Sequence, residues 1–161
     1  MALTPAQLTT LKAEILADPV LAAQPMDGNG HAVIADAMNA LATPTFTVWK
    51  SKVTTQEVGE AFNSSEVGGL TTANTNRLVV MEAYSGGTFN PSRADTRAGF
   101  DSVFSGAGGV LTRAALLALY KRTARRIEKL FATGTGSDAV PATLVFEGAV
   151  NNSDIDAARN S

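Results

Sequence analysis

Glycine and proline interrupt this sequence so often that only short helical segments fit between them. The chain has 14 glycines and 6 prolines. Thr4-Pro5-Ala6-Gln7 has the form of a capping box with proline at the first helical position, and Ser85-Gly86-Gly87 ends a later segment. The longest apolar run, Ala114–Tyr120, has seven residues, too few to cross a bilayer. The sequence therefore predicts a mostly α fold and no membrane segment.

The spacing of apolar residues between these breaks predicts a bundle of five or six helices. The expected helices cover about residues 5–18, 31–41, 55–62, 72–84, 91–104 and 110–131. The core-facing residues expected in the fourth helix are Leu78, Val79, Met81 and Ala83. The last helix is the longest, because Leu116, Leu119 and Ile127 fall on one face. Residues 43–53 favour an extended conformation.

The C-terminal part of the sequence differs in character from the helical part. Residues 134–137, Gly-Thr-Gly-Ser, have the composition of a flexible linker. Residues 141–148 are the best strand candidate. We therefore expect a helical core domain over residues 1–133, followed over residues 134–161 by the linker and an extended C-terminal arm containing a short β-strand.

Two partners fit the predicted strand, whose apolar centre is Leu144, Val145 and Phe146. It could pair with residues 46–49 of the same chain, or it could add to a sheet or groove of another subunit, where main-chain hydrogen bonds give affinity. Residues 151–161 form either a short helix capped by Ser153 or a disordered tail.

Composition excludes several kinds of chemistry. The chain has no cysteine and one histidine, His31. This excludes disulfides, a thiol nucleophile, cysteine-ligated metals and zinc sites with two or three histidines. The glycine clusters lack the lysine of a phosphate-binding loop, and Glu57 and Glu60 are expected to face solvent. We expect no catalytic residue, no cofactor and no metal site, and the N-terminus lacks the features of a secretory signal.

The sharpest charge feature lies in residues 113–129, which hold six basic residues and one acidic residue. Helical spacing predicts one basic stripe on the helix, formed by Arg122, Arg125, Arg126 and Lys129. The stripe is either a solvated face near the negative end of the helix dipole or a contact with an acidic partner, a neighbouring subunit or a DNA backbone. A pI near 5.3 argues against sequence-specific DNA recognition.

Several segments carry a resemblance to known proteins. These are Met1–Lys12, Leu70–Leu78, Glu128–Gly136, Pro141–Thr143 and Phe146–Gly148. They resemble small proteins encoded in the structural gene clusters of tailed bacteriophages, and the similarity covers most of the chain. Size, helical character and a C-terminal arm are similar to the head–tail adaptor (connector) proteins of the neck, as an analogy of architecture.

The resemblance implies a structural virion protein without enzymatic activity, assembled in the host bacterial cytoplasm. Adaptors form a twelve-fold ring below the portal and link the capsid to the tail. The implied partners are other copies of the chain, the portal protein, the next neck or tail protein, and DNA that passes through the channel without sequence readout. The residues expected to bind the portal are Leu144, Val145, Phe146 and Glu147. Deletion of residues 137–161 is expected to leave the core folded and to abolish portal binding.

Other functions stay open at this point. Within the same class, the chain could be another neck or tail component, or a capsid decoration protein. From other classes, a virion-associated cell-wall hydrolase and a nucleic-acid-binding regulator remain as alternatives. Rotational symmetry of the assembled particle, lytic activity, and salt-sensitive DNA binding separate these functions.

Overall fold

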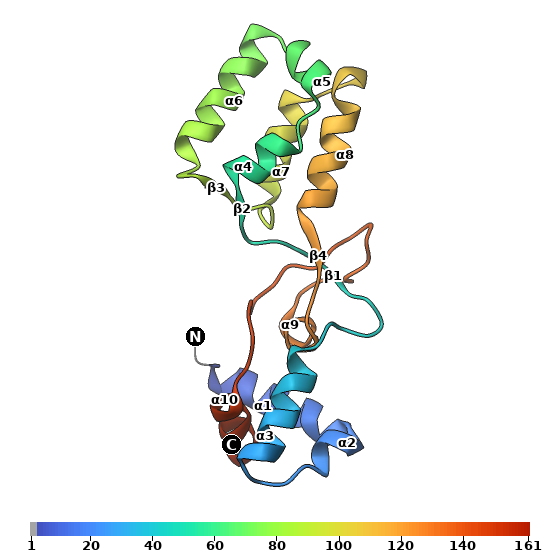
Figure 1. Ribbon diagram of the computed structural model, residues 1–161, viewed down its shortest axis with the longest axis vertical. Helices are drawn as coiled ribbons and strands as arrows, with labels where there is room; N and C mark the ends of the chain where they lie inside the picture. The colour runs from blue at the N-terminus through green and yellow to red at the C-terminus, as the bar shows by residue number, and fades with distance from the viewer. Residues whose placement is uncertain (1–2) are drawn as a thin grey trace. The chain divides into compact units, whose positions relative to one another are not determined.

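The computed structural model describes residues 3–161 and is mostly helical, as the sequence predicts (Figure 1). The described residues form ten α-helices, one short 3-10 helix and four strands of two or three residues. Five or six helices were expected. The larger number arises because several short segments, such as the four residues after Asp18, form separate helices.

The contacts divide the chain into two compact units. Unit 1 comprises residues 1–47 and 123–161, and unit 2 comprises residues 48–122. The chain passes from unit 1 to unit 2 in β1 (Thr47–Trp49) and returns in β4 (Lys121–Thr123), and these two strands pair. This division differs from the expected boundary after residue 133, because the C-terminal segment packs within unit 1.

Unit 1 is built from both ends of the chain. Its helices are α1 (Pro5–Ala17), α2 (Pro19–Ala22), α3 (Gly28–Asn39), α9 (Arg126–Phe131) and α10 (Asn152–Asn160). The predicted capping box at the start of α1 is confirmed, since the Thr4 hydroxyl accepts the backbone N–H of Gln7 at 3.3 Å and the Gln7 side chain accepts that of Thr4 at 2.9 Å. The helix ends at Asp18, whose carboxylate then caps α2.

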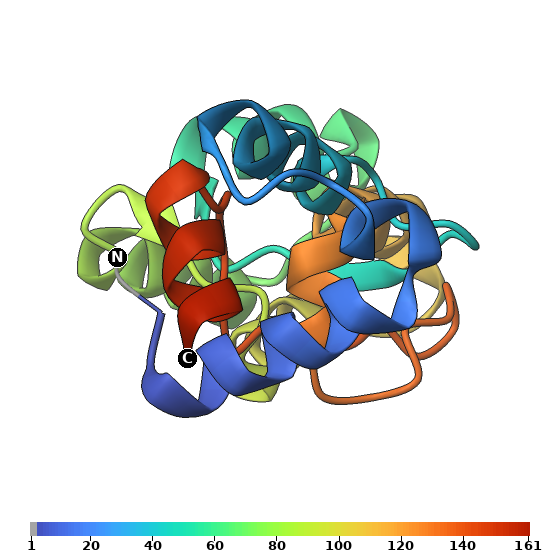
Figure 2. The ribbon, with the colours of Figure 1, turned by 90° about the horizontal axis from the view of Figure 1, so that it is seen from below.

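The predicted C-terminal arm is part of the core of unit 1. Phe146 is only 7% exposed and packs edge-on against Phe131, with 5.8 Å between ring centroids. Helix α10 buries Ile155 and Ala158 and lies against α1 and α3 (Figure 2). Deletion of residues 137–161 would therefore remove core residues, so the expectation of a folded remainder does not fit this packing.

Residues 141–148 do not form the predicted strand. Bridge contacts in this segment are confined to two residues: Thr143 forms an antiparallel bridge with Thr133, and the N–H of Ala142 donates to the carbonyl of Thr47, within residues 46–49 of the same chain, at 2.9 Å. The segment is held instead through its side chains and ends, for example by Asn39, whose side-chain amide pairs with both backbone groups of Val150. The helix that follows is capped by Asn151 and not by Ser153.

The predicted single helix over residues 110–131 is also wrong. Helix α8 (Val110–Leu119) ends before β4, and α9 starts only at Arg126. Between them the backbone pairs with residues 40–46: Ala124 exchanges hydrogen bonds with Ala42 and Phe46 at 2.9 and 2.8 Å, and Arg126 N–H donates to Ala40 at 2.8 Å. Tertiary backbone pairing thus outweighs the helical propensity of this stretch.

Unit 2 contains a second hydrophobic core. Its elements are β2 (Val53–Thr54), α4 (Thr55–Glu60), α5 (Ser64–Gly68), α6 (Thr72–Tyr84), β3 (Thr88–Phe89), α7 (Ala94–Val103), the 3-10 helix Ala107–Gly109 and α8. The short strands β2 and β3 pair antiparallel. The buried residues of the core are Val53, Val58, Phe100, Val103, Phe104, Leu116 and Tyr120.

A carboxylate from α5 fixes the start of α8. Glu66 accepts the backbone N–H groups of Leu111 and Thr112 at 2.9 and 2.7 Å, where the helix dipole favours negative charge. Partial burial raises the pKa of Glu66, but the hydrogen bonds from these N–H groups outweigh it, so the net pKa lies below the ordinary value. Unit 2 therefore ties α5 to α8 by charge as well as by packing.

Within residues 3–161 no single helix is long and apolar enough to cross a membrane. The length and composition of a span are reached only by two helical segments taken together, Ala94–Val103 and Ala107–Leu119, which are bent by 117° at their junction.

The packing of the C-terminal segment predicts a contrast between two of its residues. Ile155→Ala should lower the free energy of unfolding by about 3 kcal/mol, because it opens a cavity under a fully buried side chain. Val145→Ala, at a side chain that is 70% exposed, should change it by less than about 0.5 kcal/mol. Urea titration followed by circular dichroism measures both. Equal losses for the two variants would contradict this packing.

Candidate functional site

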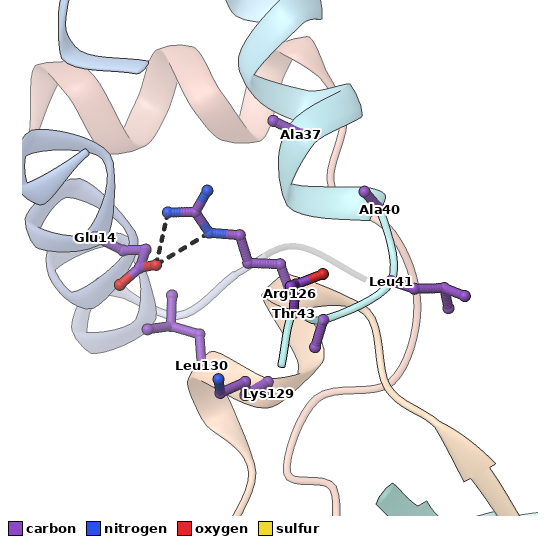
Figure 3. A pocket seen from close by; sticks show the side chains of 9 residues that line it. Glu14, Ala37, Ala40, Leu41, Thr43, Arg126, Lys129 and Leu130 are labelled. Carbon is purple, nitrogen blue, oxygen red and sulfur yellow. Dashed lines mark hydrogen bonds and ion pairs between the residues drawn. The ribbon is translucent and has the colours of Figure 1, made fainter. Parts of the chain in front are cut away.

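A large open depression in unit 1 is the candidate site (Figure 3). Its volume is about 820 Å³. It is lined by residues of α1, the end of α3, the segment that follows α3, and α9, namely Glu14, Ala37, Ala40, Leu41, Ala42, Thr43, Arg126, Lys129 and Leu130. Its walls thus come from segments more than 80 residues apart in the sequence.

Small side chains create the depression. Ala37 and Ala40 lie on the last turn of α3 and just after it, and Leu130 contributes from α9. Leu41 is 66% exposed at the rim. The apolar residues line one part of the depression, and Glu14, Thr43, Arg126 and Lys129 make the rest of its lining polar.

Arg126 is held by two carboxylates of the α1 end. Its Nε and Nη2 donate to one oxygen of Glu14 at 3.1 and 2.9 Å, and its Nη1 donates to Asp18 at 2.9 Å (Figure 3 shows the Glu14 contacts). The hydrogen bond from Arg126 and those from the backbone N–H groups of Leu21 and Val20 hold the pKa of Asp18 below its ordinary value. Arg126 therefore fastens α9 to α1.

Lys129 is the remaining cation of the depression. Its Nζ lies 5.8 Å from the ring centroid of Phe46, a cation–π distance. Within residues 3–161 it forms no ion pair with a carboxylate. The formal charges of Glu14, Asp18, Arg126 and Lys129 cancel, so Lys129 is a local cation in a depression that carries no net charge.

The four basic residues predicted as one stripe do not share a helix face. Arg122 lies in β4, Arg125 precedes α9, and Arg126 and Lys129 lie on α9. The backbone N–H of Arg125 donates to the buried carboxylate of Glu128 at 2.9 Å. The stripe was derived from helical spacing, and the helix that would carry it is interrupted.

The four residues expected to bind a portal occupy a loop of unit 1. Leu144 is half-buried, Val145 and Glu147 are exposed, and Phe146 is buried. The following residue, Gly148, donates its N–H to Glu128 at 3.1 Å. Val145 is therefore exposed to solvent in a loop that the buried side chain of Phe146 holds in place.

Gly136, in the predicted linker, allows the backbone to pack directly against the ring of Phe46. A Cβ at this position would lie 2.1 Å from the Phe46 ring, and φ is +66°. Its carbonyl accepts the N–H of Thr47 at 2.7 Å. In unit 1 this glycine therefore fixes the segment against Phe46, although its sequence context favours a hinge.

Sequence reasoning missed a second surface, on α6 of unit 2. None of the residues of this 13-residue helix is buried. Leu78 and Met81 are half-buried against the core, but Val79 and Ala83, which were expected to face it, are exposed. Val80 and Tyr84 are also exposed. The apolar residues 78–81 predict a buried helix face. The packing shows that Val79 and Val80 of this run are exposed to solvent.

The described residues contain no group of three or more histidine, aspartate or glutamate residues that could hold a metal ion. His31 is buried, with its Nδ1 3.9 Å from Asp156. Comparison with known protein families, with curated protein sequences and with solved structures finds no match.

The Arg126 ion pairs predict a pH-dependent effect at Asp18. A carboxylate with a lowered folded-state pKa stabilises the fold above its unfolded pKa of about 3.9, and this contribution is lost as the pH falls through the folded pKa. Asp18→Asn should therefore lower stability at pH 7, with the deficit shrinking below about pH 3.9. Asparagine still caps α2, so the substitution isolates the charge.

The measurement is urea unfolding at a series of pH values between 7 and 2.5. Asp36→Asn, at an exposed residue of α3, is the matched control and should show no deficit. A deficit of Asp18→Asn that stays constant through the acid range would contradict this role of its charge.

Proposed function

We propose that the protein is a structural virion subunit of a tailed bacteriophage, a head–tail adaptor that forms a twelve-copy ring below the portal and links capsid to tail. The supporting observation is the uncovered apolar face of α6, where Val79, Val80 and Tyr84 are 58, 52 and 88% exposed. Contiguous exposed apolar residues mark interaction surfaces. A structural subunit binds its neighbours through surfaces of this kind.

The distribution of charge supports assembly between copies. Unit 1 carries five basic and nine acidic residues, a formal charge of −4, whereas unit 2 carries eight basic and six acidic residues, a formal charge of +2. Opposite charges favour contact between unit 1 of one copy and unit 2 of another. Contacts of this head-to-tail kind close into rings when the rotation permits.

The partners follow from the same proposal. The loop around Val145 contacts the portal through Leu144, Val145 and Glu147, and Phe146 is its anchor in the core of unit 1. The next neck or tail protein binds the opposite end of the ring. The basic residues Arg122, Arg125 and Lys129 are proposed to face DNA without sequence readout. Arg126 is held by carboxylates of unit 1. The ring occupies the virion neck and assembles in the host bacterial cytoplasm.

The assembly state tests this proposal directly. Negative-stain images of the purified chain, classified by rotational symmetry, should show a twelve-fold ring, and mass photometry should give twelve times the 16.7 kDa chain mass. Sixfold symmetry would indicate a tail component. A protein that stays monomeric at all concentrations, with cell-wall lysis or salt-sensitive DNA binding, would indicate one of the other classes of function.

The loop around Val145 predicts a separable binding defect. Val145→Asp should leave unit 1 folded and the ring intact, but should weaken binding to portal-bearing capsids by about tenfold or more, because it places a charge in an apolar contact. Leu16→Asp, at a similarly exposed apolar residue of α1, is the control. Co-sedimentation with capsids measures both variants. Equal binding by Val145→Asp and the unmodified protein would remove this loop from the portal contact.

A further inference from the structure

Unit 2 contains a small pocket of its own, with a volume of about 90 Å³. Its walls come from α4 and the residues just after it, from α6, from β3 and from α7, which Figure 1 labels. The lining residues are Thr55, Val58, Gly59, Phe62, Leu78, Glu82, Phe89 and Phe100. All of them lie within residues 48–122, so unit 2 forms this pocket alone.

Three phenylalanine rings make up much of the lining. Phe100 is buried, and Phe62 and Phe89 are half-buried. The ring centroid of Phe100 lies 6.4 Å from that of Phe62 and 5.0 Å from that of Phe89, and the ring planes are inclined by 54° and 77°. The rings are thus not stacked in parallel. Pockets built from several aromatic rings are a recurring means of binding ammonium groups, because the face of each ring carries negative charge density.

The charge in this lining is a carboxylate. Among the described lining residues only Glu82 is charged. It is exposed and follows Leu78 by four residues, which places both side chains on the same side of α6. Within residues 3–161 its carboxylate forms no ion pair and accepts no hydrogen bond. A cation in the pocket would therefore meet an unpaired carboxylate as well as aromatic rings.

The remaining polar side chain of the lining narrows the kind of cation. Thr55, at the start of α4, carries a hydroxyl that can accept a hydrogen bond. A primary ammonium has three N–H donors, for which Glu82 and Thr55 offer oxygen acceptors. The pocket volume is about three times the ~30 Å³ share of one water in the liquid, so the pocket admits the last few atoms of an alkyl chain.

We propose that this pocket binds a primary alkylammonium group, with the end of the chain against the phenylalanine rings and the N–H donors directed to Glu82 and Thr55. Two kinds of molecule carry this group, a free alkylamine and the lysine side chain of another protein. The inference goes beyond the proposed assembly function and does not depend on it.

An NMR titration of the ¹⁵N-labelled 161-residue chain with n-butylammonium chloride tests the pocket. Saturable shifts are expected at the backbone amides of lining residues, including Gly59 and Glu82. At constant ionic strength, n-butanol and butanoate are the matched ligands, since they have a similar size but are neutral and anionic. Both should bind about tenfold more weakly than n-butylammonium or not at all.

Three variants locate the binding in this pocket. Glu82→Gln removes the charge at nearly constant size and should weaken n-butylammonium binding about fivefold. Gly59→Leu adds a side chain at a lining position where a Cβ has no atom within 4 Å, and should weaken binding about tenfold or more by occupying the space. Glu60→Gln is the matched control, because Glu60 is an exposed carboxylate of α4 outside the lining, and it should bind like the unmodified protein. Unchanged amide shifts away from the pocket show that each variant is folded.

A blocked lysine, N-acetyl-lysine methylamide, separates the two sources of the ligand. If it binds and its Nε-acetylated form does not, the pocket accepts a lysine side chain; if only n-butylammonium binds, the pocket is one for free amines. The proposal is overturned if n-butanol binds as tightly as n-butylammonium, if Glu82→Gln leaves the affinity unchanged, or if no lining amide shifts. None of these results bears on the adaptor function, which the symmetry of the assembled ring tests separately.

Discussion

Unit 1 depends on the backbone hydrogen bonds that join residues 40–46 to residues 124–126. Ala124 bonds to Ala42 and Phe46, and Arg126 bonds to Ala40. These bonds end the helical run after α8 and set α9 beside the end of α3. They also bring the Arg126 guanidinium to the carboxylates of α1. The pairing brings together two of the segments that line the depression, the end of α3 with the residues after it and α9, and α1 adds Glu14.

The sequence predicted those features that depend on neighbouring residues. The capping box at Thr4 forms because the two residues involved lie three positions apart. The predicted helix over residues 110–131 does not form because it is interrupted by backbone pairing with residues 40–46, about 80 positions earlier in the chain. The strand at residues 141–148 failed for a related reason: Phe146 reaches the core from a loop fixed by Asn39 and Gly136, and no local pattern encodes those contacts.

The candidate site was less predictable than the fold. The charge pattern of the sequence predicts that Lys129 and Arg126 belong to one basic stripe. Both residues line the depression, but among residues 3–161 Arg126 is paired with carboxylates and Lys129 is not. The pairing of Arg126 with Glu14 joins residues 112 positions apart. On α6, consecutive apolar residues Leu78, Val79 and Val80 look alike in sequence, although the first is half-buried and the other two are exposed. Which side of such a helix stays open is a property of the packing around it.

The chain order of the two units bears on when each of them can fold during synthesis. Unit 2 is continuous, so residues 48–122 can gather their core as soon as they are synthesised. The depression instead needs Glu14 together with Lys129, and the surrounding core needs Ile155 of α10. The core of unit 1 is therefore completed only when the last helix has been synthesised, whereas the core of unit 2 needs none of these residues.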